Sequence, residues 1–148
     1  MRDELYELKA QSDATTFEFT SVGPKGEIPK LVVYSKTGVK NLYNLAFGDK
    51  DPSTGDFDDL AVTNNGDSQK VLATVASTIY AFTYKYPNAL VIVKGSTKAR
   101  TRLYQMGISK NLEDITTHFM VFGEKDGIVY PFERNIGYDA FLITRKKN

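Results

Sequence analysis

The chain has 148 residues, of which 41% are hydrophobic and 25% are charged, as expected for one folded domain. Its net charge is +1, so a general electrostatic attraction to nucleic acid or to membranes is not indicated. The absence of cysteine excludes disulfides and thiolate chemistry, and a single histidine excludes a multi-histidine metal site. The start is polar and no run has the ~20 apolar residues of a membrane span. We therefore expect a cytoplasmic protein without a cofactor.

The first half of the chain predicts a meander of strands. Residues 1–14 are polar and form an N-terminal segment, and residues 15–148 are predicted to form a single α+β domain. Apolar alternation or β-branched runs, separated by turn residues, predict strands at 15–22, 28–36, 39–47 and 57–63. Short connections favour antiparallel pairing. The acidic stretch 49–59 lacks the EF-hand pattern, so it is predicted to be a solvated loop.

The second half alternates helices and strands. Asp67 or Ser68 begins a predicted helix over 68–86, whose expected buried stripe is Val71, Leu72, Val75, Ile79, Phe82 and Tyr86. An almost wholly apolar strand at 89–93 is predicted inside the sheet. The next predicted elements are a helix at 96–110 and a short helix from Asn111. They are followed by a predicted hairpin of 119–124 with 128–132 and a strand at 140–144. The pattern predicts an α+β fold, in which an antiparallel four-strand meander and a helix precede βαββ(α)β, with helices packed on one face of a twisted sheet.

The helix at 96–110 begins with unusual charges. A helix start has unpaired N–H groups and a partial positive charge, yet Lys98, Arg100 and Arg102 occupy its first turns. An anion bound there would remove this conflict. The candidate anion-binding residues are Lys94, Gly95, Ser96, Thr97, Arg100 and Arg102. Gly95 would allow close backbone approach, the hydroxyls of Ser96 and Thr97 would donate, and the two guanidinium groups would supply forked donors.

An ordinary capped helix is the alternative interpretation of the same segment. Its arginines would then cover apolar surface and pair with carboxylates. Helical spacing predicts that Ala99, Leu103 and Met106 are buried, with Arg100 and Arg102 on either side of that stripe. Neither the P-loop pattern nor the GxGxxG dinucleotide pattern is present. The segment is therefore not one of the common nucleotide loops.

Two further residues are candidates for such a site. Tyr104 lies on the same helix, and His118 is the only histidine, the residue type most often used as a general acid or base. His118 falls at a predicted helix–strand junction, where a structural histidine is the commoner case. Catalytic residues are therefore not identified from the sequence.

The segment Gly95–Tyr104 reads G-S-T-x-A-R-T-R-L-Y and follows a helix that ends in Tyr-Pro. It resembles a small family of uncharacterised bacterial proteins that contain a domain of unknown function, over most of the chain from about residue 17. The order ββββα also resembles the Whirly and Pur-alpha type of single-strand nucleic-acid-binding fold. That likeness implies binding through basic and aromatic positions of a sheet.

Three hypotheses remain open from the sequence. The first is a module that binds a phosphate-bearing ligand, including single-stranded nucleic acid, through residues 94–104. The second is a small enzyme that acts on a phosphoester or nucleotide, with Tyr104 and His118 near the two arginines. The third is a protein-interaction or regulatory module, such as one member of a toxin–antitoxin pair. None of the three involves a membrane.

Overall fold

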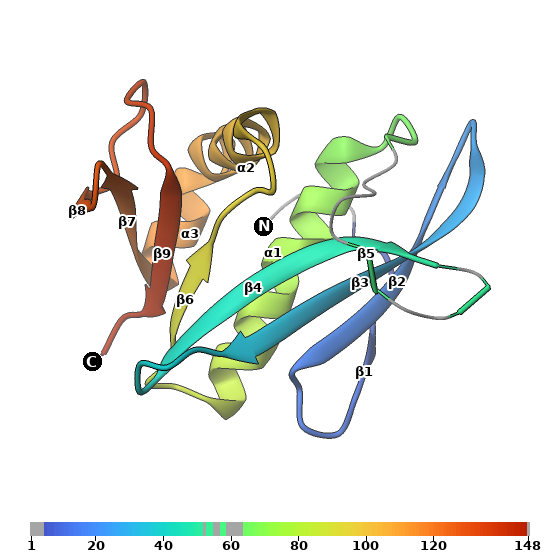
Figure 1. The fold of residues 1–148 in the computed structure, drawn as a ribbon, viewed down its shortest axis with the longest axis horizontal. Helices are drawn as coiled ribbons and strands as arrows, with labels where there is room; N and C mark the ends of the chain where they lie inside the picture. The colour runs from blue at the N-terminus through green and yellow to red at the C-terminus, as the bar shows by residue number, and fades with distance from the viewer. Residues whose placement is uncertain (1–4, 52, 55–56, 59–63, 148) are drawn as a thin grey trace. The chain divides into compact units, whose positions relative to one another are not determined.

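The computed structural model describes residues 5–51, 53–54, 57–58 and 64–147 (Figure 1). The protein is α+β, with a mostly antiparallel sheet and three helices, and the order of strands and helices broadly matches the prediction, apart from an unpredicted short strand at Lys9–Ala10. The chain divides into two compact units. The N-terminal unit comprises Arg2–Tyr34 and Ala46–Lys85, and the C-terminal unit comprises Ser35–Leu45 and Tyr86–Asn148.

The predicted N-terminal meander is present. Its strands are β1 (Lys9–Ala10), β2 (Thr16–Gly23), β3 (Gly26–Lys36), β4 (Leu42–Lys50) and β5 (Phe57–Asp58), which lie in the order β1-β2-β3-β4 with β5 on β4. The β1–β2, β2–β3 and β4–β5 pairs are antiparallel. The strand predicted at 57–63 is seen at Phe57–Asp58, and residues 59–63 lie outside the described part of the chain.

Strand β4 begins at Leu42, later than the predicted residue 39, because a wider turn precedes it. The Thr37 hydroxyl donates to the Leu42 carbonyl at 2.9 Å, and Asn41 adopts a left-handed backbone with φ of 64°. Asparagine tolerates this conformation better than most residues. The strand also continues to Lys50, into the stretch predicted to be a loop.

Helix α1 (Ser68–Lys85) supplies much of the core of the N-terminal unit. The Tyr34 ring on β3 stacks on Phe82, with ring centroids 4.0 Å apart. Val71, Val75, Ile79 and Phe82 are buried as predicted, whereas Leu72 is only half-buried and Tyr86 lies beyond the helix. The stripe also includes three buried threonines that the spacing of apolar residues did not predict: Thr74, Thr78 and Thr83. Each of their hydroxyls donates to a helix carbonyl three or four residues earlier, which makes burial tolerable.

The polar segment before β2 packs onto this unit through Tyr6. Its ring stacks on Phe19 at 5.7 Å, and its backbone N–H donates to the Thr74 hydroxyl at 2.9 Å. The hydroxyls of Tyr6 and Ser21 both donate to the Asp67 carboxylate, just before α1, where a negative charge is favourable. Burial, together with the hydrogen bond to Asp67, raises the pKa of Tyr6.

The C-terminal unit includes the first residues of β4, up to Leu45. It contains β6 (Leu90–Val93), β7 (Phe119–Lys125), β8 (Ile128–Pro131) and β9 (Ala140–Arg145), in the order β4-β6-β9-β7-β8. The β4–β6 pair is parallel, and the β6–β9, β9–β7 and β7–β8 pairs are antiparallel. Strand β6 therefore lies inside the sheet, as its apolar sequence predicted.

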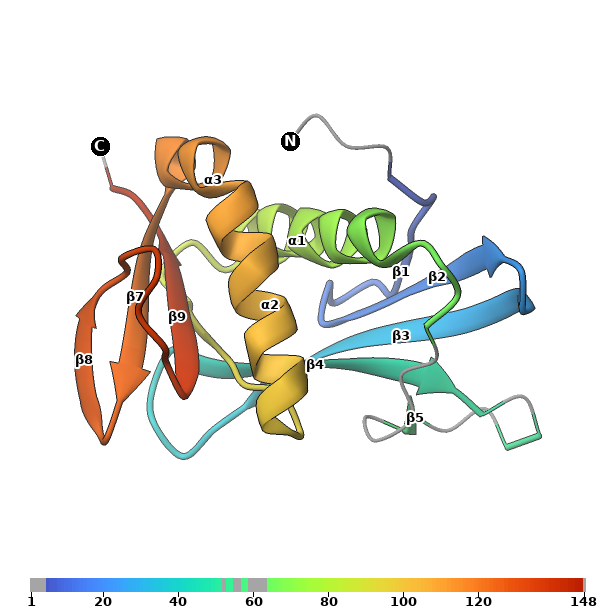
Figure 2. The same cartoon turned by 90° about the horizontal axis from the view of Figure 1, so that it is seen from above.

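Helices α2 (Lys98–Lys110) and α3 (Leu112–His118) follow each other on one side of β9 (Figure 2). The predicted stripe of α2 was wrong. Ala99 is exposed, Met106 is 61% exposed and Leu103 is half-buried, whereas Thr101 and Ile108 are buried. The helix is rotated from the predicted orientation because its first turn is held to the end of β6 through Thr101.

Candidate functional site

The corner between β6 and α2 is built around Gly95 and Thr101. The Gly95 N–H donates to Thr101 Oγ1 at 3.0 Å, and both residues are buried. A Cβ placed on Gly95 would lie 2.4 Å from the Thr101 nitrogen and 2.7 Å from the Arg100 carbonyl carbon. Glycine is therefore needed here for contact with the helix. Its N–H is used inside the protein.

Thr97 and Ser96 define the start of α2. Thr97 is the N-cap, with extended backbone, and its hydroxyl accepts from the Arg100 N–H at 3.2 Å. The Arg100 guanidinium turns back and donates through Nη1 to Ser96 Oγ. The side chain of Arg100 is thus held beside the helix start, together with the exposed side chains of Ser96 and Thr97. These three candidate residues are brought together.

The charged side chains of the segment that leads into α2 are basic. Lys94 and Lys98 are exposed, and α2 has no acidic residue in its first turn. Among the described residues, neither lysine forms a hydrogen bond or an ion pair with another side chain. The segment from Lys94 to the first turn of α2 therefore carries exposed positive charge.

Arg102 lies on another side of the helix. Two residues of helix correspond to about 200° of rotation from Arg100. Arg102 is exposed and lines a pocket of about 580 Å³, together with Gln105, Met106, Ser109 and residues 135–138. The two arginines predicted to flank one stripe thus face different parts of the surface.

The two additional candidates lie at different distances from the helix start. Tyr104 is one turn after Arg100 on the same side of α2. Its side chain is half-buried. His118 is the last residue of α3, after the far end of α2, and its carbonyl accepts from the Lys146 N–H at 2.9 Å. It lines none of the pockets described here. The structure does not place His118 beside Arg100, as the enzyme hypothesis required.

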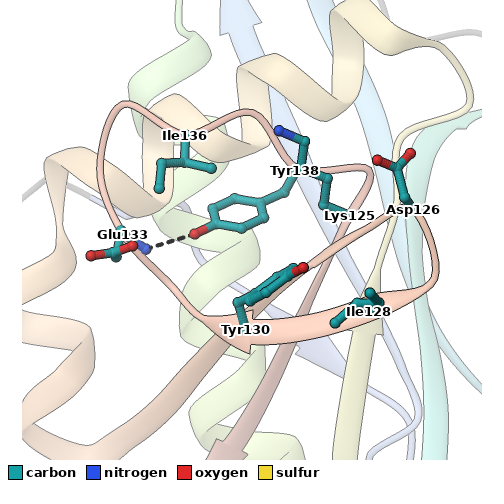
Figure 3. Close-up of a pocket in the computed structure, with 7 residues that line it drawn as sticks. All are labelled: Lys125, Asp126, Ile128, Tyr130, Glu133, Ile136 and Tyr138. Atoms are coloured by element: carbon teal, nitrogen blue, oxygen red, sulfur yellow. Dashed lines mark hydrogen bonds between the residues drawn. The ribbon is translucent and has the colours of Figure 1, made fainter.

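A second pocket, of about 410 Å³, lies between the β7–β8 hairpin and the segment that follows it (Figure 3). The Tyr138 ring crosses it, with Tyr130 below and Ile136 above, and the Tyr138 hydroxyl accepts from the Glu133 N–H at 3.0 Å. A Cβ on Gly123 would lie 2.2 Å from this ring, so glycine in β7 makes room for it. The charges at this pocket come from Lys125, Asp126 and Glu133.

Hydrogen bonds connect the segment between β8 and β9 to α2, through residues that were not predicted as site residues. The Gln105 side chain donates to the Ile136 carbonyl and accepts from the Tyr138 N–H at 3.3 Å. The Arg134 guanidinium donates to the Ser109 carbonyl at 3.1 and 3.0 Å, near the negative end of the helix. No motif or periodicity in the sequence marks these contacts, because their partners are backbone atoms distant in the chain.

Comparison of the sequence with family models gives one match. The model described as "Family of unknown function (DUF6934)" matches residues 2–146. The chain belongs to the DUF6934 family. No curated protein and no solved structure matches it. Family membership covers nearly the whole chain but brings no established activity with it.

Two further observations describe this DUF6934 member. Within the described residues, no helix is long and apolar enough to span a membrane. The same part of the chain contains no group of three or more histidine, aspartate or glutamate side chains arranged to hold a metal ion. Two of the described acidic residues in the stretch predicted to be a solvated loop form polar contacts. Asp49 pairs with the buried Lys30 at 2.5 Å, and Asp51 accepts from the Ser53 N–H at 2.8 Å.

Proposed function

We propose that the protein binds a phosphate-bearing ligand at the start of α2, with Lys94, Ser96, Thr97 and Arg100 around the anion. The observation that supports this function is the charge of the first turn of α2, which is basic and contains no acid. Exposed cations at the positive end of a helix cost about 0.3–1 kcal/mol each. A bound anion reverses the sign of that interaction and also receives hydrogen bonds from the helix N–H groups.

The side chains at this corner suit an anion in type as well as in charge. Ser96 and Thr97 are exposed hydroxyls, and the Arg100 guanidinium is held next to Ser96 by a hydrogen bond. Guanidinium groups bind phosphate through two parallel N–H bonds, which a lysine cannot do. Gly95 contributes by letting the helix start approach β6, and Arg102 has no part in binding.

Among macromolecules that carry phosphate, single-stranded nucleic acid is the ligand that we propose. The order of the first strands, which resembles that of Whirly and Pur-alpha proteins, supports this choice. Phosphate contacts release counterions, so binding of an unstructured oligonucleotide would weaken steeply as salt rises. Fluorescence anisotropy at low and at moderate salt measures this. Absence of binding at low salt restricts the ligand to small phosphates or nucleotides.

Thermal melting tests the site itself, and the chain offers a matched control. Phosphate, compared with chloride at equal ionic strength, is expected to raise the melting temperature because it binds only the folded state. Arg100→Gln should abolish this increase, while Arg102→Gln, on the same helix but facing another surface, should retain it. Phosphate that leaves the melting temperature of the wild type unchanged would refute the proposed function.

A further inference from the structure

The strands at the centre of the C-terminal unit are apolar on both faces. Strand β6 is Leu-Val-Ile-Val, and β9 begins Ala-Phe-Leu-Ile. Runs without polar alternation are typical of strands that are covered on both sides. In this unit the helices α2 and α3 follow one another on a single side of β9 (Figure 2). The sequence therefore indicates a second cover for these strands.

Many side chains of the two faces differ in exposure at the centre of the unit. On the helix-covered face, Val91 and Phe141 are fully buried and Phe119 is 1% exposed. The strand register defines the opposite face, which we name the open sheet face. Three rows of paired residues cross the strands on this face. The first row is Leu42, Leu90, Thr144 and Met120, and the second is Asn44, Ile92, Leu142, Phe122 and Pro131. The third row is Ala140, Glu124 and Val129.

The open sheet face is apolar and partly exposed. All its members except Asn44, Thr144 and Glu124 are apolar, and Met120 and Val129 are 46% and 51% exposed. Leu42, Leu90, Ile92 and Phe122 are half-buried. Leu142 and Ala140, on the central strand β9, are buried. Soluble monomers rarely expose a contiguous apolar patch of this kind, and a large one usually marks an interface.

Charged residues lie at both ends of the open sheet face. Lys94 directly follows β6, where continuing the register places it beside Ala140 and Glu124. Glu124 lies at one end of β7. Lys146 extends β9 at the other end, where its N–H donates to the His118 carbonyl, and it is exposed. Since six residues separate positions 118 and 124, the two charges lie about 20 Å apart along the strands. A second copy turned end for end would place Glu124 opposite Lys146 in both directions.

We propose that the open sheet face is the interface of a homodimer, in which two copies pack sheet against sheet about a two-fold axis that crosses the strands. Such an isologous contact buries the apolar rows of both copies and pairs their end charges. The formal net charge of +1 opposes self-association very little. Lys94, proposed to bind phosphate, directly follows β6 at the edge of this interface, whereas Ser96, Thr97 and Arg100 belong to the start of α2.

Sedimentation velocity over a range of concentrations tests the dimer. The wild type is expected to dimerise, and Met120→Glu, which places a charge within the apolar rows, should raise the dissociation constant at least about tenfold. Met106→Glu is the matched control, because Met106 is 61% exposed on α2 and lies outside the face. A monomeric wild type, or a Met120→Glu variant that dimerises as well as the Met106→Glu variant, would overturn the proposal.

A charge exchange tests the orientation without altering the apolar rows. Glu124→Lys and Lys146→Glu should each weaken the dimer, because each puts like charges opposite one another. The double variant should recover most of the wild-type affinity. If the two substitutions weaken the dimer additively, so that the double variant does not recover affinity, the end-for-end arrangement is contradicted. Circular dichroism of each variant establishes that it is folded.

Discussion

Gly95 and Thr101 join the end of β6 to the first turn of α2 through a buried hydrogen bond of 3.0 Å from the glycine N–H to the threonine hydroxyl. The Thr101 hydroxyl also lies 3.1 Å from the Thr97 carbonyl, to which it donates. One side chain thus connects the strand end, the N-cap and the helix. The position of every candidate anion-binding residue depends on this corner.

Gly95→Ala should destabilise the protein. The added Cβ would lie 2.4 Å from the Thr101 nitrogen, so the helix must move. Overpacking of this kind typically costs about 1–3 kcal/mol. Chemical denaturation measures the change in the free energy of unfolding. Gly38→Ala is the control, because a Cβ there meets no atom within 4 Å, and equal stabilities of the two variants would contradict the account of the corner.

Thr78→Val should cost about 1–3 kcal/mol, although the two side chains have nearly the same shape. The Tyr34 and Thr78 hydroxyls share a buried hydrogen bond of 2.7 Å, and valine leaves the phenol without that partner. Tyr34→Phe in the same protein should restore part of the loss, since no unsatisfied hydroxyl then remains. A double-mutant cycle by denaturant unfolding measures the coupling. Additive effects would show that the hydrogen bond contributes nothing.

Stability should fall at alkaline pH in a way that depends on Tyr34. Burial raises the pKa of this phenol above its ordinary value of 10.0. Its stabilising contribution is therefore complete below about pH 10, where the unfolded-state phenol is still protonated, and is lost as the pH rises further. Melting temperatures between pH 8 and pH 11 should decline less steeply in Tyr34→Phe. A smaller decline should persist, because the pKa of Tyr6 is also raised.

Ile79→Asp should unfold the protein at room temperature. Ile79 is 7% exposed on the core-facing side of α1, so an aspartate there would be buried without a partner. Tyr84→Asp, at a position on the same helix that is 86% exposed, should remain folded. Circular dichroism during thermal melting compares the two. A cooperative transition in the Ile79→Asp variant would mean that the helix face is assigned incorrectly.

Local patterns in the sequence predicted most of the elements. The alternation around Phe17 and Phe19, the helical spacing of Val71 to Phe82 and the turn at Lys125–Gly127 depend on neighbouring residues, so each was recognisable without the fold. The rotation of α2 was not. Its apolar positions are few, and its orientation is set by Thr101, a polar residue whose role appears only when β6 lies beside it.

The candidate site shows the same division. Sequence alone identified the basic helix start and its hydroxyl cap, because charge and capping are properties of a short segment. Three features of the site became known only from the tertiary structure. Arg102 and Arg100 face different parts of the surface, and His118 lies at the end of α3. Glycine is required at position 95 because the helix packs against it. The parallel pairing of β4 with β6, which adds Leu42 and Asn44 to the open sheet face, also joins residues far apart in the chain. Contacts of that kind depend on how the elements pack, and local sequence does not encode them.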